Sequence, residues 1–244
     1  MVYIKNWRDT STGIAHLSAV HWGGLRHQSD GSDDDRNRLQ RLDGFARHLL
    51  QGRKGSDYHN HDNLEQVYYV IAGSGEVKFD DRLHPVQAGD AVFLPPDIHH
   101  QMFNFASDDW LEHHVISMKV EPTEGTEREG QLVIKNWRDV IPTADSQGGM
   151  RWRQLSPTGD GETGCLRGMA AIDREAVQPG GRSAELCDEV IEHVYYGLEG
   201  RGLLCTDEER LEFSEGDMIH LPAGTSYWIE NPHESWVAYL IMAG

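Results

Sequence analysis

Two histidines and a glutamate lie close together in the stretch YHNHDNLE, residues 58–65. Imidazole nitrogens and a carboxylate oxygen are good ligands for borderline divalent metals, so His59, His61 and Glu65 form a candidate metal site. In one straight strand Glu65 would lie about 13 Å beyond His61, too far for metal bonds of about 2 Å. The intervening Asp and Asn favour a turn. The sequence therefore predicts a strand ending near His61, a tight turn, and a second strand that opens with Glu65 beside the histidines.

The segments that must position these side chains have the character of short strands. QVYYVIAG, residues 66–73, is rich in β-branched and aromatic residues and stops at a glycine. The chain has 26 glycines in 244 residues and shows short apolar runs separated by Gly, Pro and Asp, with no long stretch of helical period. This pattern predicts an all-β protein built from small sandwiches or barrels.

Charge and composition narrow the class of protein and its partners. The formal net charge is -18, and a field of that sign repels nucleic acid and anionic membranes, so neither is an expected partner. No window approaches the length of a membrane-spanning helix, and the N-terminus lacks the apolar core of a secretion signal. The 3 cysteines have no zinc-ribbon or CxxC spacing and read as reduced thiols. We expect a soluble, cytoplasmic protein.

The chain is an internal repeat. IKNWRD occurs at residues 4–9 and again, unchanged, at 134–139. The charged segment EPTEGTEREG offers nothing to a core and separates the copies. We therefore divide the chain into an N-terminal domain at 1–120, a linker at 121–130 and a C-terminal domain at 131–244.

Further features follow from the repeat. Over the core of the two copies a shift of 127 residues aligns the halves, for example Glu65 with Glu192. The repeated IKNWRD predicts a pair of equivalent edge strands, with Trp7 and Trp137 as paired core anchors. A second polar segment, SDGSDDDRNR at 29–38, is predicted to be a solvated loop within the first copy.

A fourth candidate ligand comes from GDAVFLPPDIHHQMFN, residues 89–104. Gly-Asp and Pro-Pro-Asp are turn sequences on either side of a short apolar strand, and another strand begins at the paired histidines. His100 and Met102 face one way on that strand, whereas His99 faces the other. Only one of the two adjacent histidines can point inward.

Together these residues resemble two motifs of the cupin superfamily. The first motif is HxH, three or four residues, then E and a later G; the second is G, five residues, PxG, two residues, H, three residues, N. The matching residues are His59, His61, Glu65, Gly73, Gly89, Pro95, His100 and Asn104. Asp97 stands where the family usually has glycine, which affects a turn rather than a ligand.

The resemblance covers both halves and implies a bicupin, an all-β protein of two tandem double-stranded β-helix, or jelly-roll, barrels. It implies that the metal ligands are His59, His61, Glu65 and His100, which selects His100 over His99. One divalent metal is expected in the N-terminal barrel, with iron first and manganese, copper, nickel and zinc as alternatives.

The second copy lacks most of these ligands. At the shift of 127 residues, Leu186 replaces His59, Asp188 replaces His61 and Tyr227 replaces His100, and only Glu192 remains. We expect this barrel to be metal-free, with Asp188, Glu192 and Tyr227 hydrogen-bonded to one another. A weak second site stays open if a register shift turns the neighbouring Cys187 and Glu185 inward.

Four further residues are candidates for a substrate pocket. Tyr69 and Met102 share the parity of the ligands along their strands, and Arg47 precedes the HxH strand. On the strand after the second motif one of His113 and His114 should face the interior, and His114 is the candidate. Core packing explains the first two as well, a structural histidine explains His114, and Arg47 could lie on the outer face.

The expected site supports three functions. The first is a mononuclear non-haem dioxygenase acting on a small organic substrate, since cupins with this ligand set include dioxygenases of flavonols, gentisate and diketones. The second is a non-redox lyase, decarboxylase or isomerase in which the metal is a Lewis acid and Glu65 the catalytic acid or base. The third is a non-catalytic small-molecule-binding bicupin. A homodimer is expected from the exposed edges of such barrels.

Overall fold

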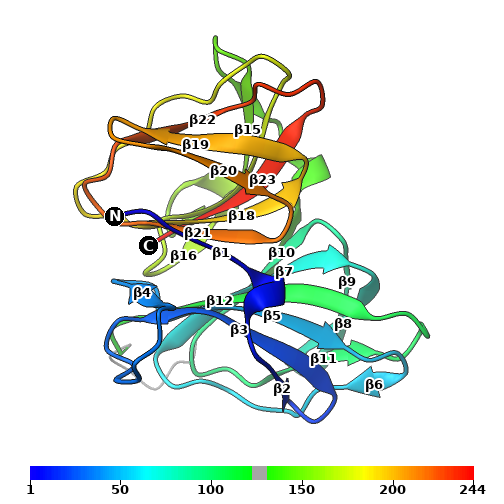
Figure 1. Cartoon of the computed structure of the whole chain (residues 1–244). Coiled ribbons are helices and arrows are strands. Elements are labelled where there is room, and N and C mark those ends of the chain that lie inside the picture. The colour runs from blue at the N-terminus through cyan, green and yellow to red at the C-terminus, as the bar shows by residue number, and fades with distance from the viewer. Residues whose placement is uncertain (123–130) are drawn as a thin grey trace.

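The computed structural model describes residues 1–122 and 131–244, and strands make up nearly all of their regular structure. The described residues also contain three single-turn 3-10 helices, η1 (Trp7–Asp9), η2 (Trp137–Asp139) and η3 (Gly161–Thr163). The strands form two barrels, one from most of each half of the chain (Figure 1). The predicted all-β fold of two tandem barrels is confirmed. The predicted linker falls outside the described residues, except for Glu121 and Pro122.

The first barrel is made of a large sheet and a small sheet. In order, the large sheet contains β13 (Val133–Asn136), β10 (Asp90–Leu94), β7 (Leu64–Ala72), β12 (Leu111–Lys119), β5 (Gly44–Leu50), β3 (Ala19–His27) and β2 (Thr12–Ala15), with β4 (Asn37–Leu39) paired to β3. The small sheet contains β6 (Lys54–Gly55), β11 (His100–Asn104), β8 (Ser74–Phe79) and β9 (Arg82–Gln87).

The second barrel repeats this arrangement. Its large sheet contains β1 (Tyr3–Asn6), β21 (Asp217–Leu221), β18 (His193–Glu199), β23 (Val237–Ala243), β17 (Ala171–Val177), β15 (Gly149–Pro157) and β14 (Thr143–Ala144), with β16 (Gly164–Leu166) paired to β15. Its small sheet contains β20 (Arg210–Ser214), β19 (Arg201–Thr206) and β22 (Tyr227–Glu230).

The first strand of each half pairs with the opposite barrel. β1 runs antiparallel to β21, with Tyr3 opposite His220, and β13 runs antiparallel to β10. Each lies at the edge of its sheet. The IKNWRD segments therefore form equivalent edge strands, but each completes the sheet of the other barrel. The predicted domain boundaries at 1–120 and 131–244 are therefore wrong for two strands, because β1 belongs to the second barrel and β13 to the first.

Trp7 and Trp137, the predicted core anchors, follow the exchanged strands and are only partly buried; Trp7 packs against the apolar core from the side. The preceding strand of each tryptophan belongs to one barrel, and its ring lies against an arginine of the other barrel. The guanidinium of Arg47 is 4.2 Å from the Trp7 ring centroid, and that of Arg174 is 4.6 Å from the Trp137 ring centroid. Cation–π contacts of this kind stabilise by about 0.5–2 kcal/mol and fix the exchanged strands in place.

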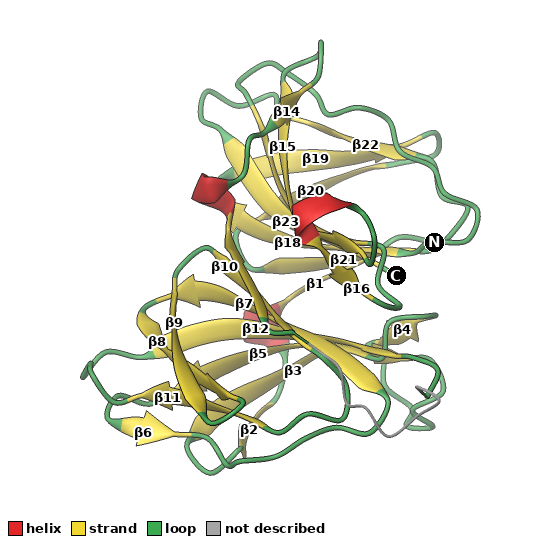
Figure 2. Ribbon diagram, turned by 180° about the vertical axis from the view of Figure 1, so that it is seen from behind, coloured by secondary structure: helices red, strands yellow, loops and turns green. Residues whose placement is uncertain are grey.

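The large sheets of the two barrels face each other across a shared apolar core (Figure 2). β7 is buried along most of its length because one of its faces lines the first barrel and the other packs against the second. The shared core contains Phe45, Val67, Tyr69, Phe93 and Ile116 from the first barrel, and Ile172, Val194, Tyr196, Met218 and Leu240 from the second. The interiors of the barrels form two separate clusters.

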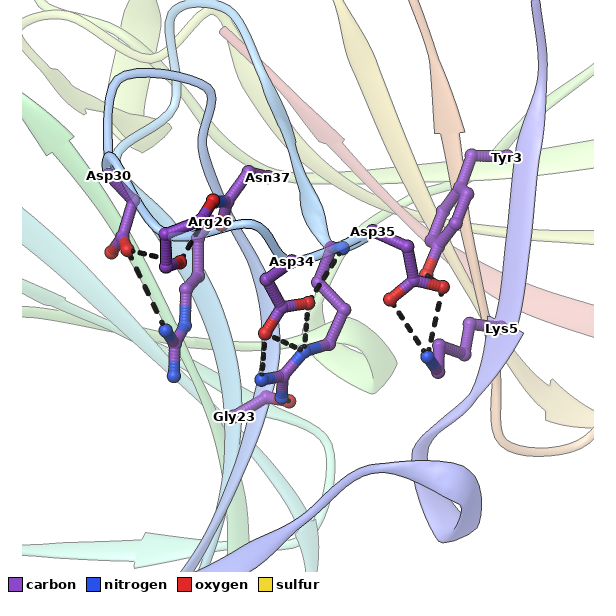
Figure 3. Close-up of polar contacts among 10 residues, drawn as sticks. Tyr3, Lys5, Gly23, Arg26, Asp30, Asp34, Asp35 and Asn37 are labelled. Atoms are coloured by element: carbon purple, nitrogen blue, oxygen red, sulfur yellow. Dashed lines mark hydrogen bonds and ion pairs between the residues drawn. The ribbon is translucent and has the colours of Figure 1, made fainter.

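The acidic segment at 29–38 is not simply a solvated loop, as Figure 3 shows. Asp35 accepts hydrogen bonds from Lys5 Nζ at 3.0 Å and from the Tyr3 hydroxyl at 3.1 Å, both on the exchanged strand β1. Arg36 is buried, pairs with Asp34 and donates to the carbonyl oxygen of Gly23 at 2.6 Å. The segment therefore ties the first barrel to a strand that belongs to the second.

Candidate metal centre

Three of the four predicted ligands meet inside the first barrel. An antiparallel bridge joins His59 to His100, with His100 N donating to His59 O at 2.8 Å. The bridge brings the loop before β7 onto the start of β11, so that His59, His61 and His100 each offer a ring nitrogen within 4.8 Å of the others. The ring centroids of His59 and His100 are 4.6 Å apart.

The ring orientations suit a metal ion. His59 Nδ1 lies 3.2 Å from the carbonyl oxygen of Asp57, and His100 Nδ1 lies 3.1 Å from that of Ile98. Because a carbonyl oxygen only accepts, Nδ1 carries the proton in both rings and Nε2 keeps its lone pair for a ligand bond. His59 Nε2 is buried and has no hydrogen-bond partner. A buried polar atom of this kind is explained by an ion or water bound there.

Burial keeps the ligand imidazoles neutral. It lowers the pKa of His100 to about 3, and it also lowers the pKa values of His59 and His61. Neutral imidazole is the form that binds a metal, so the three rings need no deprotonation at neutral pH. The residues therefore fit a divalent metal held by three histidine nitrogens.

The prediction that Glu65 is the fourth ligand is wrong. Its carboxylate points away from the histidines and into the interface between the barrels. Oε2 accepts from the backbone N–H of Arg167 at 2.7 Å, and Oε1 accepts from those of Gly168 at 2.9 Å and Met169 at 2.6 Å. Burial raises the pKa of this carboxyl, against the three backbone hydrogen bonds that lower it. Glu65 is fully occupied by the second barrel and is not free to act as the catalytic acid or base.

Glu192 makes the reciprocal contact from the second barrel. Its carboxylate accepts from the backbone N–H groups of Gln40, Arg41 and Leu42 at 2.7–2.8 Å, and it also pairs with His220 at 2.8 Å. Burial alone would raise the pKa of Glu192, but the His220 and backbone hydrogen bonds lower it overall. The retained glutamates thus stabilise domain docking, which explains why Glu192 survives in a barrel that has lost the other ligands.

Gln66 takes the position that sequence reasoning assigned to Glu65. Side chains alternate along β7, so Gln66 and Tyr68 face the interior of the first barrel, whereas Glu65 and Tyr69 face the second. The Tyr68 hydroxyl lies 3.2 Å from His100 Nε2. Gln66 Oε1 is buried without a partner. Gln66 stands four residues after HxH, the longer spacing that the motif allows, but it is a glutamine where the motif has glutamate.

The predicted pocket residues lie in different places. Met102 is buried in the interior of the first barrel, on the same face of β11 as His100. The other three belong to the shared core, so their assignment to a pocket is wrong. Arg47 donates to the Tyr196 hydroxyl at 2.8 Å, Tyr69 is part of the shared apolar core, and the rings of His114 and Tyr196 are 4.0 Å apart. β5 and β12 turn these faces toward the second barrel.

Two imidazoles outside the predicted set of pocket residues line the interior instead, and of the adjacent His113 and His114 it is His113 that faces inward. His48 and His113 are opposite each other on β5 and β12, with ring centroids 5.5 Å apart. His21 Nδ1 lies 2.7 Å from His48 Nε2, and the His113 ring is 5.0 Å from that of Tyr68. Burial lowers the pKa of His48 to about 2 and that of His113 to about 3. The imidazoles of His48 and His113 are therefore uncharged at neutral pH.

The second barrel replaces this histidine cluster by other side chains. The Tyr195 hydroxyl donates to the Tyr227 hydroxyl at 3.1 Å, and Asp188 accepts from the backbone N–H groups of Val190 and Ile191 at 2.9 Å. The expected hydrogen bonds among Asp188, Glu192 and Tyr227 are wrong, because each has other partners. Within residues 1–122 and 131–244, groups of three or more ligand-type side chains close enough to share one ion occur only in the first barrel.

The sequence matches the cupin domain family twice, at residues 47–117 and 173–243. These matches cover more than half of the chain, and the chain belongs to the cupin family with two cupin domains. The exchanged first strand of each half lies outside both matched ranges.

Comparison with known proteins places the chain among bicupins. It is 43% identical over 66 residues to the uncharacterized protein MJ1618 of Methanocaldococcus jannaschii, a match that covers 27% of this chain and about half (53%) of that relative. Bacterial pirin YhhW from Escherichia coli, solved in complex with nickel(II), has a TM-score of 0.74 and 17% identity over 99% of this chain and 98% of its own. Oxalate decarboxylase from Lactobacillus farciminis, solved as a formate complex, has a TM-score of 0.75 and 13% identity over 98% and 85%. At these identities the two structures show the fold alone.

No helix in the described part of the chain is long and apolar enough to cross a membrane.

Proposed function

We propose that the first barrel is the active site of a metal-dependent enzyme, a mononuclear non-haem dioxygenase acting on a small organic substrate. The observation that carries this proposal is the convergence of three neutral imidazoles, His59, His61 and His100, on one partly buried position. A divalent metal bound there would supply open coordination positions for an oxygen donor of the substrate and for dioxygen. Iron is the first candidate, with manganese, copper, nickel and zinc as alternatives.

The chain's own residues define what the site can hold. His59 and His100 are oriented by backbone carbonyl groups, so their Nε2 atoms point at the site without a cost in rearrangement. All three histidine ligands are neutral, so a divalent ion keeps its full charge and favours a substrate that binds as an anion, such as an enolate or phenolate. Tyr68, whose hydroxyl lies beside His100 Nε2, is placed to donate a hydrogen bond to an oxygen bound at the site.

The alternative of non-redox acid–base chemistry has less support. Its proposed acid or base, Glu65, is held by three backbone N–H groups of the second barrel. The buried imidazoles of His48 and His113 are weak bases because burial lowers their pKa values to about 2 and about 3. Oxygenation that relies on the metal and dioxygen does not require Glu65, His48 or His113 to act as an acid or a base.

Oxygen uptake tests the proposal. Protein reconstituted with Fe(II) under anaerobic conditions would be mixed with aerated diketones, catechols and flavonols, with the His59→Ala variant as the control. The proposal predicts uptake with at least one of these classes and none with the control. Full iron loading without uptake on any class would refute the dioxygenase assignment.

A further inference from the structure

A strained turn brings a fourth histidine against the ligand cluster. β2 and β3 are joined by residues 16–18, and His16 and Leu17 adopt φ values of 48° and 68°. Two consecutive non-glycine residues in the left-handed region cost energy that the surrounding structure must offset, and such strain concentrates at functional sites. Leu17 projects into solvent, whereas His16 turns inward and stacks on His59 with ring centroids 4.5 Å apart.

Asp57 joins these two rings. Its Oδ1 lies 2.8 Å from His16 Nδ1 and 3.5 Å from His59 Nδ1. His16, Asp57 and His59 thus form a second group whose ligand atoms all lie within 4.8 Å of one another. His59 is common to both groups. Its Nδ1 faces this outer group, while its Nε2 is the buried atom without a partner beside His100.

The outer group is only partly buried throughout and carries a charge, whereas the inner group ends on the buried ring of His100. The side chains of His16 and Asp57 are 27% and 42% exposed, whereas His100 is 3% exposed. Asp57 adds a carboxylate, the charged ligand that the three inner histidines do not supply. A hydrated dication approaching this protein, whose net charge is -18, is attracted to the exposed carboxylate of Asp57 before it reaches the buried His100.

We propose that His16, Asp57 and His59 form an outer divalent-cation site, at which an incoming metal ion is captured before it passes to His59, His61 and His100. The two positions are occupied in turn, because Nδ1 of His59 is protonated when Nε2 serves the inner site. The proposal adds an entry route to the metal centre of the proposed function and shares only His59 with it. It requires no particular reaction.

Cobalt(II) binding, followed by its visible absorbance, tests the proposal without any assay of activity. The His100→Ala variant, whose inner site is broken, is predicted to bind one cobalt ion with reduced affinity. Adding Asp57→Asn or His16→Gln in that background should weaken the remaining binding at least tenfold. Asp62→Asn is the matched control, since Asp62 is an exposed carboxylate beside His61 outside both groups. It removes the same charge and should change the affinity less than about twofold.

Stopped-flow loading of the otherwise unaltered protein gives the second readout. Asp57→Asn is predicted to slow cobalt loading severalfold while the final stoichiometry of one ion per chain is kept. Equal effects of Asp57→Asn and Asp62→Asn, no binding by His100→Ala, or an unchanged loading rate would each overturn the outer site. Absence of oxygen uptake with the cobalt results as predicted would remove the dioxygenase proposal and leave the outer site standing.

Discussion

Replacing Glu65 by glutamine separates its role in domain docking from the role of a metal ligand. The amide can keep one oxygen toward Gly168 and Met169, but its NH2 group cannot accept from the backbone N–H of Arg167. Losing one hydrogen bond to a charged acceptor costs about 1.5–3 kcal/mol. The two remaining bonds weaken by roughly half, since charge-assisted bonds are about twice as strong as neutral ones. The neutral amide is easier to bury, which offsets part of this loss.

The net expectation for Glu65→Gln is a loss of about 2–3 kcal/mol in the free energy of unfolding. Urea denaturation followed by tryptophan fluorescence should show a midpoint lower by about 1 M, given slopes of about 1–3 kcal/mol per M. Cobalt(II) affinity and stoichiometry should stay unchanged. Glu192→Gln is the matched control, because Glu192 makes the same three backbone contacts and one more to His220. It should cost at least as much stability.

The opposite pattern would refute this account of Glu65. If Glu65→Gln lost its metal while the urea midpoint stayed at the wild-type value, Glu65 would be a ligand, and its position in the interface would be wrong. Loss of stability together with full cobalt binding would support the interface role.

Three further predictions address the site and the interface. His100→Ala should lose its metal on gel filtration, which strips an ion held only at the reduced affinity of the outer site, whereas Tyr227→Phe, its counterpart in the second barrel, should keep it. Metal analysis that finds equal loss would mean that both barrels contribute. Gln66→Glu should raise cobalt(II) affinity about tenfold in a competition titration, since a carboxylate facing the histidines adds charge attraction, and an unchanged affinity would show that Gln66 faces elsewhere. The folded-state pKa of Glu192 is lowered from 4.5, so its stabilising contribution is present above pH 4.5 and is lost as the pH falls through the folded-state value. The stability deficit of Glu192→Gln in urea should therefore shrink as the pH falls below 4.5, and a deficit independent of pH would count against the charged contact.

The three histidines illustrate what the sequence could predict. Histidines at positions 59, 61 and 100 are ligand-type residues whose spacing matched both motifs, and alternation along β11 put His100 and Met102 on one face. The alternation of side chains along a strand does not depend on the rest of the fold, so the predicted orientation of His100 and Met102 agrees with the structure.

Glu65 shows where the sequence was insufficient. The motif allows three or four residues after HxH, and the glutamate at position 65 fits the shorter spacing, but a shift of one residue turns a strand side chain to the opposite face. The choice of Glu65 as a ligand also carried the error to Tyr69, which shares the face of Glu65. One signal was present. Glu192 is retained in a barrel that has Leu186 and Tyr227 in place of the histidines, so the glutamate had to serve something other than the metal.

The docking of the barrels could not be read from local patterns. The second buried face of β7 looks like any core strand, and only the complete fold shows that it packs against the other barrel. The exchange of β1 and β13 depends on which sheet edge each strand meets, and the repeated IKNWRD sequence is compatible with either edge. Contacts between distant segments such as Asp35 and Lys5 have the same origin.

Anomalous diffraction at the cobalt edge, on crystals grown with cobalt(II), locates the bound ion among these side chains. We predict one dominant peak inside the first barrel, about 2 Å from Nε2 of His59, from Nε2 of His100 and from a ring nitrogen of His61. A first barrel without a peak, or a dominant peak beside Glu65 or inside the second barrel, would contradict it.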